Sequence, residues 1–544
     1  MKVEAKRKIR AGKWTTNLRS TTSAFTAREK NSPRSAQRPR SKKAQWTSLI
    51  SVVRASLWFG AILLSAALLC ARERNSPPSV PPPEPIALPL PTVRALPNGL
   101  QVLVVERHSL PVLTLRMNIT AGPEADPPNL PGTAQFAASM YNEGTTHHSA
   151  LDLAEAIDGA GGTFDNNSEW DISSATLTVL SDHAPLAFDL MADMTLHPAY
   201  APADVERIRK QTVSAIEVLH EDPAYLADAV TDQLILAGTP YGHPGDGTLD
   251  ATRNLTSQDL AAFHAAAYLP GHSVLAVVGD ITPAEAFQLA ERYFAGWAGP
   301  PSASAAAHSA PSWPVRTSAA GTTRIVIVDK PDAVQTEIRV GFPGIPHSSP
   351  DYVALTVANQ ILGGPASNRL FSDLRGEHGL TYSASSDIDC YVTTGVWVAK
   401  TSTRNAETAK AVQRVLEEMK HMREHAISAG ELQQAADYLI GHQALDFETS
   451  AGIADQFLDL MTYHLPLDTW STLPAALRKL TPDDVWQATR RYLDPDQATI
   501  VLVGNASVFE RDMRKLGATR VIPIDALDLA SPGLERTGGG SGAR

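Results

Sequence analysis

The chain has 544 residues, of which 43% are hydrophobic, and a formal net charge of -11. This length suffices for two to four domains that each bury a core. Residues 1–43 carry 14 Lys or Arg and two Glu, a net of +12 (14 minus 2), which leaves -23 (-11 minus 12) for the rest. An acidic body argues against nucleic acid as the main partner. Two cysteines, Cys70 and Cys390, exclude a disulfide framework and a cysteine-rich zinc site.

The N-terminal region is predicted to direct export. Residues 1–47 are predicted to be a basic, disordered segment. Residues 48–74 are predicted to be a signal peptide or membrane anchor, because residues 55–71 (ASLWFGAILLSAALLCA) lack charge. Positive charge upstream keeps that side in the cytoplasm. The body is therefore expected to be periplasmic, or attached to the membrane by this segment.

Two features of this segment leave its processing open. Cys70 follows an apolar run, as a lipidated cysteine does, but Leu69 stands where a small residue is expected. Translation starting near Val53 would remove the basic segment and leave an ordinary signal peptide. The segment is thus cleaved, lipidated or retained.

Composition divides the rest of the chain into two folded halves. Residues 75–92 are a proline-rich linker, and residues 300–321 form a second linker of Ala, Ser and Pro. The halves are residues 93–299 and 322–512, and residues 513–544, ending in GGGSGAR, are predicted to be a flexible tail.

The two halves contain an internal repeat. Residues 255–280 and 480–505 both predict a capped amphipathic helix, a turn with proline and an apolar strand ending in Gly. The offset is 225 residues at both Leu255/Leu480 and Gly279/Gly504. Residues 100–117 and 323–340 also match, each as strand, turn and strand. Duplication of one α+β unit explains both matches.

The elements of the first half predict its layers. A helix over residues 151–162, closed by two glycines, precedes a hairpin over 163–180. Helical spacing follows in residues 183–196, 204–220 and 223–236. The predicted fold class is α+β, with two homologous lobes that each pack helices on one face of a mainly antiparallel sheet.

Four segments carry a resemblance to a known family. They are residues 131–145 (PGTAQFAASMYNEGT), 157–167 (IDGAGGTFDNN), 241–244 (YGHP) and 367–386 (SNRLFSDLRGEHGLTYSASS). Over about residues 93–510, the chain resembles the pitrilysin and mitochondrial-processing-peptidase family of zinc peptidases. The resemblance implies a clam-shell of two lobes around a peptide or unfolded protein.

The resemblance also implies where a zinc site would lie. Active members carry His-x-x-Glu-His on a helix, with two imidazoles on one face to bind zinc and the Glu as general base. The matching positions here are Gln135, Ala138 and Ser139. The family's later Glu ligand falls near residues 215–216, and Glu217 would point elsewhere on its helix. We therefore expect no metal at this position and an inactive isolated chain.

Other histidines are not expected to replace the lost ligands. His147 and His148 are adjacent and would diverge on a helix, so an exposed loop is the simpler interpretation. His220 belongs to a polar helix end, and His243 of YGHP is expected to be a turn residue.

The resemblance assigns a different role to the second half. Arg375 and Tyr382 match the Arg and Tyr that the family's second lobe contributes to the active cleft, although they also fit a helix cap and a strand start. Gly161, Gly162 and Asn166 match the strand edge along which family substrates pair their backbone.

Three hypotheses follow for the function. The first is a non-catalytic, zinc-free subunit of a heterodimeric metalloendopeptidase, whose zinc-bearing partner uses Arg375 and Tyr382 of this chain. The second is a structural or peptide-binding homologue without a role in proteolysis. The third is an active hydrolase with an unrecognised site. Zinc is expected in the partner and no cofactor in this chain.

Overall fold

The computed structural model describes residues 81–84, 86, 88, 90–299, 324–365 and 368–536. The fold below is that of the described residues from 82 to 536. The predicted basic segment, the signal peptide or anchor and the linker at 300–321 lie outside the described residues. No helix within the described ranges is long and apolar enough to cross a membrane.

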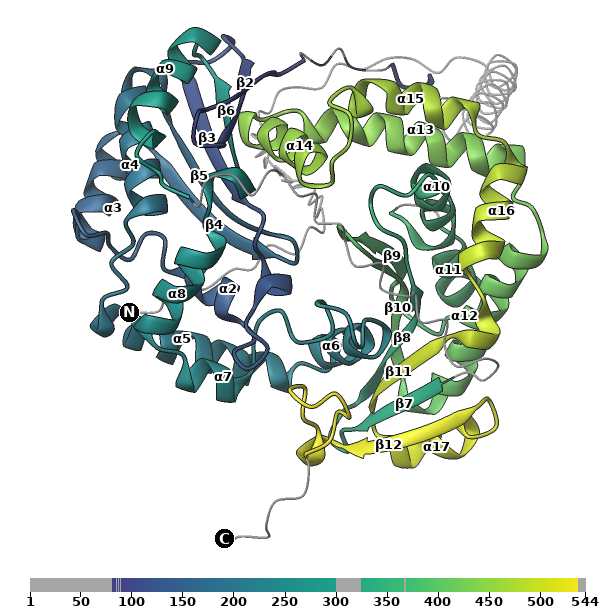
Figure 1. The fold of residues 1–544 in the computed structure, drawn as a ribbon. Helices are drawn as coiled ribbons and strands as arrows, with labels where there is room; N and C mark the ends of the chain where they lie inside the picture. Colours follow the sequence, from purple (N-terminus) through teal and green to yellow (C-terminus); the bar gives the residue numbers. More distant parts are fainter. Residues whose placement is uncertain are drawn as a thin grey trace, which may run out of the picture. The chain divides into compact units, whose positions relative to one another are not determined.

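The first half forms a six-stranded sheet with the order β1-β2-β6-β3-β5-β4 (Figure 1). β2 and β6 are parallel, and the other neighbours are antiparallel. The inner strands read as continuous apolar runs because both faces of the sheet are covered. The strands are β1 (Thr92–Ala95), β2 (Gln101–Glu106), β3 (Val112–Ile119), β4 (Thr163–Glu169), β5 (Ile172–Leu180) and β6 (Ser273–Gly279).

The second half forms another six-stranded sheet, with the order β12-β7-β11-β8-β10-β9. β7 is parallel to β11 and β12, and the remaining pairs are antiparallel. Five strands of each sheet follow the same order and directions, which confirms the two-lobed α+β fold. The strands are β7 (Arg324–Asp329), β8 (Gln335–Pro343), β9 (Ala384–Cys390), β10 (Gly395–Arg404), β11 (Thr499–Gly504) and β12 (Ala518–Pro523).

One helix of each half begins at the cap that the sequence predicts. Thr256 and Asp259 form a reciprocal capping box at the start of α8. Thr481 and Asp484 form the matching box at α16 of the second half. The helices of the first half are α2 (Thr133–Ser139), α3 (Ala150–Gly159), α4 (Ala184–Leu196), α5 (Pro202–Glu221), α6 (Pro223–Ile235), α7 (Leu249–Asn254), α8 (Ser257–Ala267) and α9 (Pro283–Phe294).

The second half has a similar succession of helices and one irregular turn. The turn, η4 (Ser372–Glu377), is π-helical and follows a single turn of α-helix. The helices are α10 (Tyr352–Gly363), α11 (Arg369–Phe371), α12 (Thr408–Glu424), α13 (Ala429–Asp446), α14 (Ser450–Thr462), α15 (Thr469–Lys479), α16 (Pro482–Tyr492) and α17 (Ala506–Met513).

Each half packs one helix onto the sheet of the other half. α6 contacts β8 and β11, and its Leu226 and Val230 share a buried cluster with Val503. In return, α14 contacts β3 and β6, and its Phe457 shares a cluster with Val278. The helices of each half were predicted to cover one face of its sheet, and this exchange covers the other.

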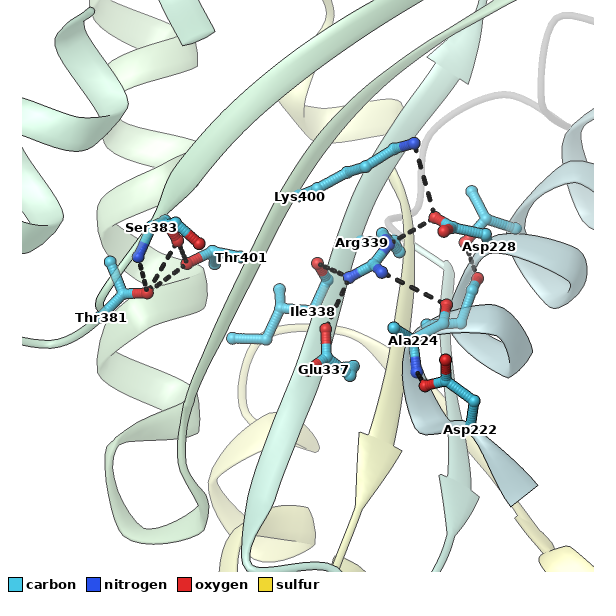
Figure 2. A network of polar contacts seen from close by, with 12 residues as sticks. Asp222, Ala224, Asp228, Glu337, Ile338, Arg339, Thr381, Ser383, Lys400 and Thr401 are labelled. Atoms are coloured by element: carbon cyan, nitrogen blue, oxygen red, sulfur yellow. Dashed lines mark hydrogen bonds and ion pairs between the residues drawn. The ribbon is translucent and has the colours of Figure 1, made fainter. Parts of the chain in front are cut away.

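A charged network fastens α6 to the second sheet (Figure 2). Arg339 of β8 has a side chain that is only 5% exposed. Its Nε donates to Asp228 Oδ1 at 2.6 Å, and its Nη2 donates to the carbonyl oxygen of Ala224 at 3.3 Å. Glu337 and Lys400 complete the network, 3.1 Å from Arg339 Nη1 and 3.6 Å from Asp228 Oδ1. The buried cation is thus satisfied by groups from both halves.

The chain after α17 corrects one prediction. Residues 513–544 were predicted to be a flexible tail, but β12 extends the second sheet beside β7. Leu529 and Leu534 are buried in the cluster around α6, and Gln233 Nε2 donates to the carbonyl oxygen of Ser531 at 2.8 Å. The prediction is wrong for residues 513–536, because the side chains of Leu529 and Leu534 fill the buried cluster around α6. Residues 537–544 lie outside the described ranges.

We expect Arg339→Ala to lower the free energy of unfolding by on the order of 3 kcal/mol, because it leaves two carboxylates without their buried cation. Urea denaturation of the full-length chain, followed by circular dichroism, measures this change. Arg404→Ala removes an exposed arginine at the end of β10 and should change the value by less than about 0.5 kcal/mol. Equal midpoints for the two variants would contradict a role of Arg339 in joining the halves.

Candidate functional site

The positions of the lost zinc motif lie on α2. Asp126 fixes the start of this helix, since its carboxylate accepts from the backbone N–H groups of Gly132 at 2.5 Å and Ala134 at 2.7 Å. Gln135 and Ser139 are partly exposed and one turn apart, so they share a face. Ser139 Oγ donates to a carbonyl oxygen of its own helix at 2.6 Å, and Ala138 is buried. An amide and a hydroxyl therefore stand where two imidazoles would bind zinc.

A cavity of about 230 Å³ opens beside Gln135. No three of its described His, Asp and Glu side chains bring ligand atoms within 4.8 Å of one another. The residues present therefore do not fit the zinc ion that the resemblance places here. The lining includes Gln135, Trp170, Tyr225, Asp228, Asp232 and His243.

The family's later ligand is also missing. On α5, Ala215 is exposed and Ile216 is buried, and neither offers a ligand atom. Glu217 is exposed, and its carboxylate lies 3.1 Å from the guanidinium of Arg253 on α7. The nearest carboxylate is thus engaged in an ion pair on the surface.

Burial changes the acidity of the cavity wall. It raises the pKa of Asp232 to about 7, and the carboxylates of Asp389 and Asp228 raise this pKa further, against the opposing effect of Lys400 and Arg339. The cavity wall therefore holds a carboxyl group that changes charge near neutral pH.

The YGHP segment takes part in the contact between the halves. Tyr241 Oη donates to Asp171 Oδ1 at 2.6 Å, and Asp171 Oδ2 accepts from the backbone N–H of Val392 at 3.1 Å. The ring of Tyr241 stacks on Tyr391 at 4.8 Å between centroids. Burial raises the pKa of Asp171 to about 6. This aromatic pair and its carboxylate connect β5 of the first half to the turn before β10.

His243 has the turn role that its sequence context predicts. Its ring nitrogens face the carbonyl oxygens of Pro123 at 3.0 Å and Pro244 at 3.2 Å. Burial lowers its pKa. The other questioned histidine, His220, stacks on Tyr225 with 6.2 Å between centroids.

Arg375 and Tyr382 lie together at the surface of the second half. Arg375 belongs to the π-helical turn η4, a type of local structure that is frequent at functional sites. Its guanidinium carbon lies 4.6 Å from the centroid of the Tyr382 ring and 5.0 Å from that of Phe371. Its Nη1 donates to the carbonyl oxygen of Tyr382 at 3.1 Å. Among the described residues, Arg375 makes no ion pair with a carboxylate.

The backbone around Tyr382 is fixed, although its side chain lies at the surface. The Oγ1 atom of Thr401 in β10 lies within hydrogen-bonding distance of Thr381 Oγ1, at 3.0 Å, and of the carbonyl oxygen of Ser383, at 2.9 Å (Figure 2). Thr403 Oγ1 donates to the carbonyl oxygen of Leu380 at 2.6 Å. The side chain of Tyr382 itself is 81% exposed. A rigid strand start thus presents an aromatic hydroxyl and a cation to the outside.

The predicted substrate edge is strand β4. Gly161 has φ +61° and ends α3, and a Cβ at Gly162 would lie 2.9 Å from the carbonyl oxygen of Thr178. Asn166 is partly buried in β4, opposite Ala175 of β5. No described strand pairs with the outer edge of β4. An extended peptide can add to such an edge.

Several residues that shape the site escaped sequence reasoning. Asp126 caps a helix that begins seven residues later, and Asp171 bridges the halves by accepting from the backbone N–H of Val392. Thr381 and Thr401 meet across strands from positions 20 residues apart. None follows a motif spacing. The aspartates had one signal, because both lie in turns beside apolar elements, where a carboxylate often accepts from the backbone.

The fold and the site define a two-lobed zinc-peptidase-like protein that lacks the family's metal ligands. Residues 101–243 match the model described as Insulinase (Peptidase family M16), and residues 254–439 match the Peptidase M16 inactive domain. Together these matches span more than half of the chain. The chain belongs to the pitrilysin-like peptidase family M16.

Similar curated proteins carry contrasting names. An "uncharacterized zinc protease" of Streptomyces coelicolor is 26% identical over 406 residues, 74% of this chain and 87% of that protein. The "non-peptidase homolog YmxG" of Helicobacter pylori is 22% identical over 409 residues, 74% of this chain and 91% of that protein. The family thus contains relatives named as peptidases and as non-peptidases.

Solved structures show the same fold. The peptidase M16 inactive domain from Pseudomonas fluorescens has a TM-score of 0.69 at 28% identity and covers 76% of this chain and 98% of its own. A protease from Helicobacter pylori has a TM-score of 0.68 at 18% identity and covers 76% of this chain and 100% of its own. Both agree with the two-sheet architecture.

We expect Asp232→Asn to reduce the dependence of stability on pH. From about pH 4 to about pH 7, the unfolded chain releases this proton while the folded chain keeps it, because the folded pKa is about 7 against an ordinary value of 3.8. Stability therefore falls as pH rises through this window, and the variant lacks this contribution.

Urea midpoints measured at pH 4, 5.5, 7 and 8 test this expectation. Asp250→Asn serves as control, since the side chain of Asp250 is 93% exposed. The midpoint of Asp232→Asn relative to the parent should rise with pH, whereas that of Asp250→Asn should stay level. Parallel profiles for Asp232→Asn and the parent would contradict burial of a protonated carboxyl.

Proposed function

We propose that this chain is a non-catalytic, zinc-free subunit of a heterodimeric pitrilysin-type metalloendopeptidase. The partner carries the zinc ion, and Arg375 and Tyr382 of this chain reach its site. One observation carries the proposal: the chain has no ligand set on α2, yet it presents Tyr382 and Arg375 from a rigid backbone.

The two side chains have complementary chemistry for peptide hydrolysis. The planar guanidinium of Arg375 can bind a substrate carbonyl or carboxylate in a fixed geometry. The hydroxyl of Tyr382 can donate to the oxyanion that develops at the scissile carbonyl. Their stacking at 4.6 Å keeps the two donors together. Since no carboxylate of the described residues pairs with Arg375, its charge is available for a substrate.

Substrate contact in this chain is proposed along β4. Its outer edge can pair with an extended peptide or an unfolded protein, and Gly161 and Gly162 allow the chain to enter that edge closely. Asn166 adds a side-chain amide at the middle of the strand. Without a zinc site beside it, this edge guides the substrate toward the partner.

An inactive peptidase homologue agrees with the comparisons, since one relative is named a non-peptidase homolog. The alternative is a structural or peptide-binding homologue with no part in proteolysis. Export to the periplasm or attachment to the membrane is proposed from residues 55–71 alone.

The experiment mixes this chain with a candidate partner, a family member from the same organism that carries an intact His-x-x-Glu-His helix and copurifies with it. Turnover of a mixture of quenched fluorescent peptides is then measured. Arg375→Ala and Tyr382→Phe should each lower kcat by on the order of 10²-fold, because each removes a transition-state donor. The isolated chain should cut none of the peptides.

Arg404→Ala is the control, because it removes an exposed arginine of the same sheet. Size-exclusion chromatography should show the same assembly for all variants. Full turnover with Tyr382→Phe and Arg375→Ala in an intact assembly would favour the structural alternative. Peptide hydrolysis by the pure single chain would refute the proposal.

A further inference from the structure

We propose that His147, Asp193 and His197 form a binding site for one divalent transition-metal ion of the zinc type. The site shares no residue with the cavity beside Gln135, and it goes beyond the proposed function. One ligand atom from each of the three side chains lies within 4.8 Å of the others.

Two of the ligands come from the end of one helix. Asp193 lies in the last turn of α4, and His197 is its C-cap. The backbone N–H of His197 donates to the carbonyl oxygen of Asp193 at 2.9 Å. Residues four apart on a helix project from the same face, so the carboxylate and the imidazole are directed to one point.

The loop before α3 brings the third ligand to that point. The backbone N–H of Thr146 donates to the carbonyl oxygen of His197 at 2.8 Å, and Thr145 forms a β-bridge with Pro198. The rings of His147 and His197 are consequently 5.0 Å apart between centroids. The backbone of this loop is thus fastened to the segment that carries His197.

Other groups orient the carboxylate. Asp193 Oδ2 accepts from Thr145 Oγ1 at 2.5 Å and lies 2.9 Å from His148 Nδ1. Its Oδ1 is directed at His147 Nδ1, 2.5 Å away. The Asp193 side chain is 8% exposed, whereas that of His147 is 57% exposed. Outer partners that hold a ligand in this way are typical of metal sites.

The donor set decides the kind of ion. Two imidazoles and one carboxylate suit zinc and related first-row ions, at about 2.0–2.2 Å from each donor atom. The exposed imidazoles can close on an ion by rotation of their side chains alone. The ion would lie where His147 Nδ1 and Asp193 Oδ1 face each other, and a fourth position would stay open to water.

This inference revises the expectation for the paired histidines. They do lie in an exposed loop, as expected, but the turn directs both His147 and His148 at Asp193. The second cluster with suitable side chains, Asp373 with Glu377 and His378, does not carry a similar proposal. Arg414 already binds both oxygens of Asp373.

The test uses the full-length, metal-free chain without an affinity tag. Calorimetric titration with Zn²⁺ should show one site, and Co²⁺ should give visible absorption bands. His147→Ala and His197→Ala should each weaken Zn²⁺ binding by at least about 10-fold, because loss of outer partners alone weakens metal sites by 10- to 100-fold. Zn²⁺ should also raise the Tm of the parent but not that of the two variants.

The matched control is His108→Ala. His108 is also 57% exposed and faces Asp280 at 2.7 Å and Glu106 at 3.6 Å, yet it has no second imidazole among its ion-pair partners. Its removal should leave Zn²⁺ affinity unchanged. If His197→Ala disturbs folding, as judged by circular dichroism, His147→Ala in the exposed loop decides the test.

Two outcomes would overturn the site. One is a parent chain that binds no Zn²⁺ at one equivalent. The other is that His147→Ala and His197→Ala bind Zn²⁺ with the same affinity as the parent. Zinc that is lost with His147→Ala, in a chain that cuts no peptide, supports this site and leaves the proposed function intact. Zinc that persists in both variants and supports hydrolysis contradicts both proposals.

Discussion

The structure depends on the exchange of two helices between its halves. A sheet of six strands exposes two apolar faces, and the helices of its own half cover one of them. α6 and α14 cover the other faces reciprocally. Arg339 then adds a buried charge that is paired with carboxylates of both halves. The positions of β9, β10 and Tyr382 relative to α6 follow from this packing.

In the first half, the packing of α2 is independent of the residues at the positions of the zinc motif. α2 persists because Asp126 caps its start and because Ala134 and Ala138 are buried under the sheet. None of these contacts requires the side chains at 135 and 139. The packing of α2 therefore does not depend on metal ligands at these two positions. In the second half, Arg375 and Tyr382 contribute little to the core, so their presence has no explanation in packing.

Much of the fold was predictable from local signals. Capping boxes and apolar periodicity placed α8, α16 and the strands after them, and the matched order of strands supports the predicted duplication. The sheet on which α6 packs was not predictable. An amphipathic pattern shows which face of a helix is buried, but it does not show which element covers that face. The same limit applies to β12, whose apolar residues resemble those of an ordinary loop. Asp193 and His147 are 46 positions apart in the sequence and meet only when the intervening chain is folded.

The exchange of helices makes each half depend on the other for its stability. A half without its counterpart would expose one broad apolar face of its sheet. Neither half is therefore a domain that is stable alone. Cutting the chain between its halves should therefore yield two aggregation-prone fragments, because each would present an uncovered apolar sheet face to solvent.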